Sequence, residues 1–470
     1  MMKPFTALPS PAGSLPIIGH LRLLKDVTSF SKFVTKHIQN LGPIFKMNFI
    51  GQSMVYVADP SAVEKVFRNE GHYPTRSLID KNVDWIMQRR NEPSLFIFQT
   101  GKEWLTNRSK ATKQALPANV FSYCSGFNKV AKQFIRNVHE IQNKDGTVND
   151  IRDLVRYWSL EAGAHFTFGV NLDSQCDEDG HAKELQNATG AVIDSLYELQ
   201  TAFPLYKIVA TSSYKQFNRG LDKVYEIGRK YADKYISDIK TRAALKKERV
   251  HGTSLIEQWL IEGNMSQDEA IGNAISMLAA GLDTTAATVS FILYELAKHP
   301  EVQEKVYQQM QSVMDDDEDI DGSSLHKLPY LGLIIKEAQR LYSVTNFPTR
   351  LLDHDIELLG YHIPAKVPIL GVMEAMSQDP MLFKDPQKFN PDRWTTDDIH
   401  PFIVLPFGFG AKGCWGRRFA EVEIKILLCQ LVRHFEMKSN FPSDRLPYDV
   451  FALTVLKFKT GEDKSYSERP

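Results

Sequence analysis

The sequence has little of what marks a secreted, nucleic-acid-binding or polytopic membrane protein. Its four cysteines, Cys124, Cys176, Cys414 and Cys429, are widely separated and too few for a disulfide framework, which favours a reducing compartment. Its 56 basic residues nearly balance 57 acidic ones, so no overall positive field exists to hold a nucleic acid. With 43% hydrophobic and 24% charged residues, the composition is that of a globular protein and excludes disorder.

Targeting and membrane-spanning segments are also not evident. The amino terminus, Met1–Phe5, has neither the apolar core of a signal peptide nor an Arg-rich presequence pattern, and residues 1–20 predict an extended, proline-rich opening segment. One stretch, residues 270–297, is long and apolar enough to cross a bilayer. It carries Asn273, Asp283 and Glu295, and an acidic residue near the centre of a span is costly. We therefore predict a helix buried inside the protein.

The patterning along the chain is mainly helical. No repeat of 20–50 residues and no Gly/Ser linker is present, which argues against solenoids and propellers. Apolar residues at i, i+3/i+4 spacing predict helices at 28–40, 59–70, 101–114, 127–142, 151–168, 183–199, 212–245, 266–298, 300–314 and 329–342. Alternating segments predict strands at 44–48 and 53–57, paired around Gly51, and at 355–358, 369–373 and 452–459. We predict one large, mainly α domain over residues 1–470 with a small β part.

The longest predicted helix carries a polar notch. Ser266 and Glu269 fit a capping box, and His299-Pro300 ends the apolar pattern, giving about 32 residues or nearly 50 Å. Its middle reads Ala-Gly-Leu-Asp-Thr-Thr at 280–285, where Gly and Thr are poor helix formers. The Thr284 hydroxyl can bond the carbonyl four residues earlier and bend the helix. The notch is therefore either a tolerated kink or a candidate reaction site.

Two motif matches fail in their context. Residues 408–413, Gly-Phe-Gly-Ala-Lys-Gly, fit the dinucleotide pattern G-x-G-x-x-G, but no strand precedes them and a helical pattern follows to about Phe435. Asp317, Asp319 and Asp321 resemble the start of a calcium loop, but Leu328 stands where the bidentate Glu is needed. We interpret the second segment as an acidic, solvated loop.

The same glycine-rich segment leads directly to a cysteine. Residues 407–416, Phe-Gly-Phe-Gly-Ala-Lys-Gly-Cys-Trp-Gly, place the Cys414 thiol after a flexible loop and at the start of a predicted helix. Glycines let the backbone turn sharply and approach a flat partner. The N–H groups of the loop and of the helix terminus stabilise a thiolate. A single thiolate held in this way suits an axial ligand of haem iron, where it favours O–O cleavage.

This segment resembles the haem-binding loop of the cytochrome P450 monooxygenases, F-G-x-G-x-R-x-C-x-G, with Lys412 where Arg is usual. Further family motifs follow in the expected order. The notch at 280–285 is similar to the oxygen-activating segment of the central helix, and residues 337–340 are similar to the E-x-x-R pair. Residues 391–394 are similar to the segment that supplies a second Arg, and residues 104–108 are similar to the W-x-x-x-R element. The resemblance implies a P450-like fold with a long central helix over haem and a Cys-ligand loop before the penultimate long helix.

The resemblance also assigns roles to individual residues. It implies haem b with Cys414 as its iron ligand, O2 and reducing equivalents as cosubstrates, and Asp283 and Thr284 as the proton-delivery pair. The remaining roles are haem contacts at Trp104, Arg108, Arg350, Phe407 and Lys412, and a buried charge network of Glu337, Arg340 and Arg393. The pocket residues by family position are aromatic or apolar, which favours a mostly hydrocarbon substrate, although each also fits ordinary core: Trp85, Ile86, Phe96, Phe98, Met277, Ala280, Val344, Phe347 and Val455.

A subfamily resemblance rests on residues 3–5, 72–76, 204–207, 348–350 and 414–418, which look like the animal mitochondrial branch. It implies the matrix side of the mitochondrial inner membrane, peripheral membrane contact, and sterols, steroids, secosteroids or lipophilic xenobiotics as substrates. It also implies electrons from an adrenodoxin-like [2Fe-2S] ferredoxin. Lys336, Arg417 and Arg418 fall at ferredoxin-facing basic positions of that branch, but Gly332 stands where another Lys is common. On residues alone, Arg417, Glu421 and Lys425 fit equally well as i,i+4 pairs on a solvated helix face.

Three alternatives stay open on sequence alone. A haem protein that binds a gas or steroid without turnover is disfavoured by the intact notch at 280–284 and the intact Glu337–Arg340 pair. A thiolate-haem isomerase or peroxide user often lacks the Asp-Thr pair that is present here at 283–284. A microsomal-type P450 fed by a flavoprotein reductase shares all of the chemical motifs.

Overall fold

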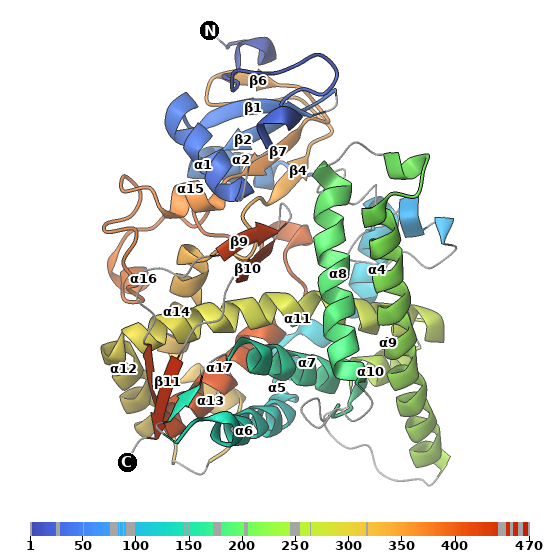
Figure 1. The fold of residues 1–470 in the computed structure, drawn as a ribbon, viewed down its shortest axis with the longest axis vertical. Helices are drawn as coiled ribbons and strands as arrows, with labels where there is room; N and C mark the ends of the chain where they lie inside the picture. Colours follow the sequence, from blue (N-terminus) through green and yellow to red (C-terminus); the bar gives the residue numbers. More distant parts are fainter. Residues whose placement is uncertain are drawn as a thin grey trace.

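The computed structural model describes residues 2–468 apart from 25–28, 50, 76–82, 84, 88, 91–98, 145, 149–150, 173–179, 202–204, 245–253, 264, 316–317, 440–447, 452–454 and 459–463 (Figure 1). The predicted helices are all present, with bounds close to those expected. They are α1 (Phe30–Leu41), α2 (Pro60–Arg68), α4 (Gly101–Thr112), α6 (Cys124–Ile141), α7 (Arg152–Phe168), α8 (His181–Thr201), α9 (Ser212–Ala244), α11 (Gln267–Lys298), α12 (Pro300–Gln311) and α14 (Pro329–Leu341).

The helix predicted after the cysteine loop is α17 (Arg417–His434). The resemblance implies that the cysteine loop precedes the penultimate long helix. In the described part of the chain α17 is the last helix, so the loop instead precedes the last long helix. Shorter helices that the apolar spacing did not predict are α5 (Pro117–Phe121), α10 (Leu255–Glu262), α13 (Gly322–His326), α15 (Met373–Ser377) and α16 (Arg393–Thr396). Single 3-10 turns are η1 (Phe5–Ala7), η2 (Leu21–Leu24), η3 (Lys113–Ala115), η4 (Leu205–Lys207) and η5 (Gly410–Lys412).

The β part consists of small sheets, as predicted. The largest has the order β1-β2-β7-β4, where β1 (Ile44–Phe49) and β2 (Gln52–Val57) form the antiparallel hairpin around Gly51, and β2 pairs in parallel with β7 (Pro368–Gly371). The strand β4 (Thr349–Leu351) adds antiparallel to β7. The remaining strands are β5 (Ile356–Leu358) with β6 (Tyr361–Ile363), β9 (Tyr448–Phe451) with β10 (Val455–Phe458), and β11 (Lys464–Glu468) between β3 (Thr147–Val148) and β8 (Phe435–Ser439).

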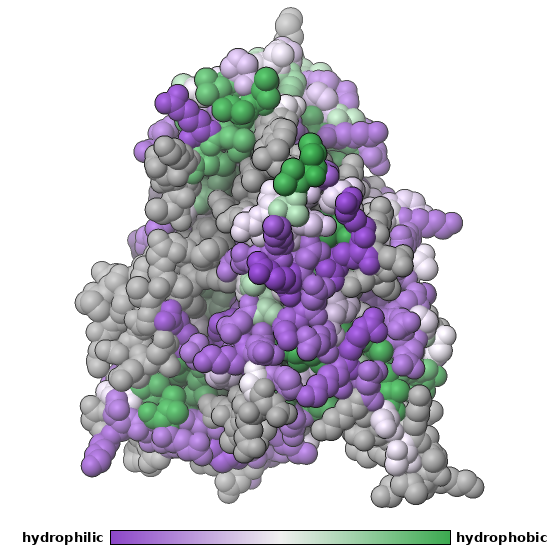
Figure 2. Space-filling model, turned by 45° about the vertical axis from the view of Figure 1, so that its right-hand side comes forward, coloured by the Kyte–Doolittle hydropathy of each residue, from purple (hydrophilic) through white to green (hydrophobic). Residues whose placement is uncertain are grey.

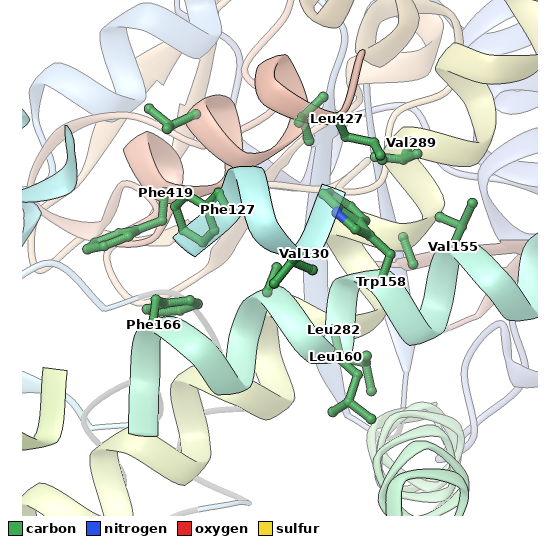
Figure 3. Close-up of a cluster of buried hydrophobic side chains, with 14 of the residues drawn as sticks. Phe127, Val130, Val155, Trp158, Leu160, Phe166, Leu282, Val289, Phe419 and Leu427 are labelled. Atoms are coloured by element: carbon green, nitrogen blue, oxygen red, sulfur yellow. The ribbon is translucent and has the colours of Figure 1, made fainter. Parts of the chain in front are cut away.

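The main hydrophobic core lies among four helices. Figure 3 shows side chains of α6, α7, α11 and α17 interleaving, and the ring of Phe419 stacks on that of Phe166 with centroids 4.9 Å apart. Close packing is required at Gly163 of α7, where an added Cβ would lie 2.7 Å from a methyl group of Leu278. This packing fixes α11 and α17 against each other through their neighbours.

A second core lies under the sheets, where α1, α2 and α15 surround the β1-β2-β7-β4 sheet in the upper part of Figure 1. Its residues come from both ends of the chain, because Val55 and Val57 pack in one cluster with Leu352, Ile369 and residues up to Leu405. The opening segment is tied to the same region, since the Lys3 N–H donates to the Gly360 carbonyl.

The helix α11 runs through the middle of the molecule (Figure 1). The expected capping box forms at Ser266 and Glu269, and the helix ends at Lys298 with His299 as its C-cap. It remains one continuous helix across the 280–285 notch. Among the described residues it is the one helix long and apolar enough to cross a membrane. However, 78% of its most apolar 18-residue stretch is buried inside the protein. That burial is typical of a core helix.

The described surface on the face shown in Figure 2 is mainly hydrophilic. Figure 2 shows the face toward which α8 and α9 are turned, with apolar side chains in separate patches. The most exposed large apolar side chains include Ile17, in the opening segment, and Ile208, between η4 and α9, each 82% exposed.

Candidate active site

The loop before α17 presents the Cys414 thiol at an exposed position. Gly408 and Gly410 both have φ +69°, the left-handed conformation that glycine adopts without strain. The loop closes when the Cys414 N–H donates to the Phe407 carbonyl at 2.7 Å. The thiols of Cys124 and Cys429 are buried, and burial raises the pKa of each to about 12, so both remain protonated. Cys176 lies outside the described residues. Among the three described cysteines, Cys414 is therefore the one placed to bind a metal.

Three cations gather around this loop, and they are Arg108, Arg350 and Lys412, the residues for which the resemblance implies haem contacts. Arg108 Nη2 donates to the Gly413 carbonyl at 2.6 Å, and Arg350 Nη2 donates to the Phe409 carbonyl at 2.9 Å. Lys412 Nζ donates to the Gln99 carbonyl at 2.8 Å and lies 4.0 Å from the centroid of the Trp104 ring, which also lies under Arg108. The structure thus brings Trp104, both arginines and Lys412 to the same loop.

Glu70 is a component that the sequence did not indicate. Its carboxylate forms a buried ion pair with Arg350, and its Oε1 accepts a hydrogen bond from the Ala411 N–H at 3.2 Å. A Cβ at Gly410 would lie 2.2 Å from that Oε1, so the loop passes directly over the carboxylate. Glu70 therefore anchors the loop to the end of α2. Because it acts across 341 residues of sequence, no local signal identifies it.

The 280–285 notch of α11 is fastened to the neighbouring helix α7 by two side chains. The Leu282 carbonyl accepts from Ser159 Oγ of α7 at 2.9 Å, and Asp283 Oδ1 lies 3.2 Å from Nη2 of Arg156, also in α7. The expected bond from Thr284 Oγ1 to the Ala280 carbonyl is present at 2.9 Å. Asp283 is buried, and its Oδ2 has no hydrogen-bond partner among the residues that the structure describes.

A buried acid connects this notch to the helix that follows the cysteine loop. Thr285 Oγ1 donates to Oε1 of Glu423 in α17 at 3.2 Å. Burial raises the pKa of Glu423 to about 8, and the hydrogen bond from Thr285 opposes only part of that effect. Glu423 is therefore largely protonated at neutral pH. The one feature of the sequence that marks Glu423 is that an acidic residue lies on the apolar face of α17, next to Val422 and Ile426.

The three residues of the predicted charge network, Glu337, Arg340 and Arg393, lie in direct contact. Glu337 accepts from Arg340 Nε at 2.9 Å and Nη2 at 2.8 Å, and from Arg393 Nε at 3.0 Å. The side chains of Glu337 and Arg340 are 0% exposed and that of Arg393 is 2% exposed. The other guanidinium N–H groups donate to backbone carbonyls, among them those of Ser377 and Lys384. The network thus joins α14 to the segment between α15 and α16.

The structure places the predicted pocket residues in different surroundings. Ala280 is exposed although most of α11 is buried, and a Cβ at the adjacent Gly281 would meet no described atom within 4 Å. In the described part of the chain, no side chain therefore covers this side of the notch. Trp85, Ile86, Met277 and Val344 belong to or pack on the main core, whereas Phe347 packs on Phe30 in the core under the sheet. Phe96, Phe98 and the side chain of Val455 lie outside the described residues.

These features fit a bound haem. The loop offers an exposed thiol to iron, and Arg108, Arg350 and Lys412 all donate hydrogen bonds in or beside it. Guanidinium and ammonium groups bind carboxylates through charge-assisted hydrogen bonds, and haem carries two carboxylates. The exposed Ala280 on a helix of the core provides an apolar, open surface. The site is that of a haem-thiolate protein.

The cytochrome P450 family model matches residues 9–460, and the chain belongs to that family. It is a cytochrome P450 monooxygenase that uses haem b, O2 and reducing equivalents. The chain is 30% identical to rat 25-hydroxyvitamin D-1 alpha hydroxylase, mitochondrial, over 88% of this chain and 84% of that protein. It is 27% identical to human sterol 26-hydroxylase, mitochondrial, over 84% and 77%. It is also 28% identical to the probable cytochrome P450 12c1, mitochondrial, of Drosophila melanogaster, over 97% and 92%.

The basic residues predicted to face a redox partner lie on exposed parts of α14 and α17. Arg417 forms a 2.9 Å ion pair with Glu421, as the i,i+4 alternative expected, but the structure shows no matching pair between Glu421 and Lys425. Arg418 Nη1 donates to the Ala115 carbonyl at 2.8 Å. Lys336 Nζ lies 3.8 Å from the centroid of the Trp394 ring. Burial, and less strongly the charge of Arg417, lowers the pKa of Lys336, so these two cations are neighbours.

Proposed function

We propose that this P450 hydroxylates a mostly apolar substrate, a sterol, steroid, secosteroid or lipophilic xenobiotic, with electrons from a [2Fe-2S] ferredoxin. The observation that carries the proposal is the meeting of the exposed Cys414 thiol and three cations on one loop, joined through α17 to the α11 notch. Bound haem supplies the activation of O2. The relatives named as sterol and 25-hydroxyvitamin D hydroxylases support this substrate class.

Within this proposal, Asp283 and Thr284 deliver protons to the site. The Arg156 guanidinium holds Asp283 through Oδ1, which leaves Oδ2 to exchange hydrogen bonds with water. Thr284 Oγ1 donates to the Ala280 carbonyl and keeps its lone pairs to accept from a water molecule. The two side chains are consecutive on a helix that is fixed on both sides, so their positions change little during turnover.

The remaining residues hold the cofactor and the substrate. Cys414 binds the iron, and Arg108, Arg350 and Lys412 balance the haem carboxylates, with Trp104 and Phe407 packing beside them. Ala280, Met277, Ile86, Trp85 and Val344 line the substrate side. This lining is apolar, so it orients the substrate by shape more than by hydrogen bonds.

The donor and the location follow from the relatives and the surface charges. Lys336, Arg417 and Arg418 give a nearly neutral chain a local positive surface, which can steer an acidic ferredoxin. Relatives named as mitochondrial support the matrix side of the inner membrane. Exposed apolar side chains such as Ile17 and Ile208 support peripheral membrane contact.

The spectrum of the ferrous carbonyl complex tests the iron ligand. The wild type should show the red-shifted absorption of a thiolate ligand, and Cys414→His should lose it. Cys429→Ala, which removes a buried thiol, is the matched control and should keep the band. An unchanged spectrum in Cys414→His would remove the basis of the proposal.

Coupling of electrons to product tests the proton-delivery pair. Thr284→Ala should keep haem content and substrate affinity but divert reduced oxygen to peroxide, which lowers the product formed per electron consumed. Thr288→Ala is the control, because its hydroxyl bonds the Thr284 carbonyl at 2.9 Å in the same helix. Equal coupling in Thr284→Ala and Thr288→Ala would leave Thr284 as a structural hydroxyl.

Reconstitution with each donor tests the partner. A ferredoxin should support turnover, and Arg418→Glu should raise its Kd by about tenfold or more, which is about 1.4 kcal/mol, without changing substrate affinity. Binding should weaken with salt, because the Debye length falls from about 10 Å at 0.1 M to about 3 Å at 1 M. Turnover with a flavoprotein reductase and none with any ferredoxin would assign the chain to the microsomal type.

A further inference from the structure

The surface behind the cysteine loop contains a further cation, Lys425, that neither the motifs nor the relatives assign. The helices α14 and α17 pack together with Gly332 beside Lys425 and Lys336 beside Arg417. Residues 332 and 336 are one turn apart on α14, and residues 417 and 425 are two turns apart on α17. Since the earlier residue of α14 lies beside the later residue of α17, the two helices run in opposite directions along one face. We call Lys336, Arg417 and Lys425 the cation row.

Lys425 lies over a gap in α14. Its Nζ and Cε are 3.9 Å and 4.0 Å from the position that a Cβ on Gly332 would occupy. The absence of a side chain at Gly332 therefore makes room for this ammonium group. Lys425 of α17 thus places a positive charge beside position 332 of α14, where α14 itself has no side chain.

The charge of Lys425 is not neutralised within the described part of the chain. The nearest acid in its own helix row, Glu421, pairs with Arg417 at 2.9 Å, and no ion pair or hydrogen bond joins Lys425 to any described residue. Counting Lys336, Arg417, Lys425 and Glu421, the row carries a net charge of +2 in a chain whose overall net charge is −1. Mutual repulsion of these cations is relieved when an anionic surface binds.

We propose that Lys425 is a docking residue for the electron donor, and that it extends the surface for an acidic ferredoxin from Lys336 and Arg417 across Gly332. This inference rests on the proposed ferredoxin dependence and deepens it. The row begins three residues after Cys414, so a partner seated on it lies next to the thiolate loop. Charge complementarity selects the partner, since a carboxylate-rich surface is what ammonium and guanidinium groups with a net positive charge attract.

The experiment measures binding of a [2Fe-2S] ferredoxin to the haem-loaded protein at several salt concentrations. Lys425→Gln should raise the Kd by about threefold to tenfold at low salt and flatten its salt dependence, as expected for a charge at the rim of an interface. Lys36→Gln, at an exposed position of α1 outside the cation row, is the matched control and should leave the Kd unchanged. Soret absorption and substrate affinity should be the same in all variants.

A relocation variant separates charge from packing. In the Lys425→Gln background, Gly332→Lys places an ammonium on the same face from the other helix and should return the Kd to within about twofold of the wild type. Equal Kd values for wild type, Lys425→Gln and Lys36→Gln, with weakened binding in Arg418→Glu, would overturn the role of Lys425 and leave the ferredoxin proposal standing. Failure of the wild type to bind or accept electrons from any ferredoxin would overturn both.

Discussion

Glu337→Gln is expected to be strongly destabilising, because it removes one negative charge from between two buried guanidinium groups. In the wild type the Glu337 carboxylate accepts three hydrogen bonds from Arg340 and Arg393, and a fourth from the Asn390 N–H at 3.0 Å. The net charge of the three side chains is +1. Glutamine keeps the shape but raises that charge to +2, and its NH2 group faces N–H donors where the carboxylate offered an acceptor.

The burial of the network sets the size of the effect. With the side chains of Glu337 and Arg340 0% exposed, water cannot compensate the lost partner. Breaking such a pair costs about 3–5 kcal/mol, a large part of the roughly 5–15 kcal/mol that separates folded from unfolded proteins. The exposed pair of Lys132 and Asp319, at 2.7 Å with side chains 41% and 56% exposed, is the comparison, and Asp319→Asn should cost at most about 1 kcal/mol.

Urea unfolding of the haem-loaded protein, followed by Soret absorption and tryptophan fluorescence, measures both variants. If unfolding is irreversible, the rates of thermal inactivation give the same ranking. The reasoning would be refuted if Glu337→Gln lay within about 1 kcal/mol of the wild type and of Asp319→Asn, since the carboxylate would then not compensate the two guanidiniums.

Three further predictions concern neighbouring parts of the site. Between pH 4.5 and about 8 the unfolded chain has Glu423 ionised while the folded protein keeps it protonated, so stability should fall by up to about 1.4 kcal/mol per pH unit as pH rises. Glu423→Gln should remove this contribution, and a melting-temperature difference from wild type that stays constant with pH would contradict it. Gly410→Ala should lose haem content, because its Cβ meets Glu70, whereas Gly360→Ala, at φ +80° with open space, should cost only about 1–2 kcal/mol and keep haem. Arg156→Met should destabilise by about 1–3 kcal/mol by leaving Asp283 buried without its ion pair, and most of that loss should be recovered in the double variant with Asp283→Asn; additive effects in the cycle would show that the pair is not coupled.

The long elements could be predicted from the sequence because their signals are local. The capping box at Ser266, the C-terminal stop at His299-Pro300 and the apolar stripe between them define α11 without reference to any other segment. The hairpin around Gly51 is defined in the same way. Strands β3, β8 and β11 were missed because they are two to five residues long, and because Thr147 finds its partner at Ser465, at the other end of the chain.

The same distinction applies to the site. Cys414 with its glycines, and Glu337 with Arg340 three residues later, are short patterns that sequence analysis can read directly. Glu70, Arg156 and Glu423 were not predicted, since each acts on a residue more than 120 positions away and ordinary helix positions surround it. The position of Lys425 over Gly332 likewise depends on how two helices cross, which no pattern within either helix encodes.

On the ribosome, β2 emerges long before the strand that completes its sheet. Val57 pairs with Gly371, so about 310 residues must be added before β7 is available, which takes about 15–60 s at roughly 5–20 residues per second. Throughout that interval the β2 edge of the β1–β2 hairpin is open, and side chains such as Val55, which the finished protein buries completely, are exposed to solvent or to chaperones. The region that is synthesised first is therefore among the last to be completed, and it carries the main risk of misassembly during synthesis.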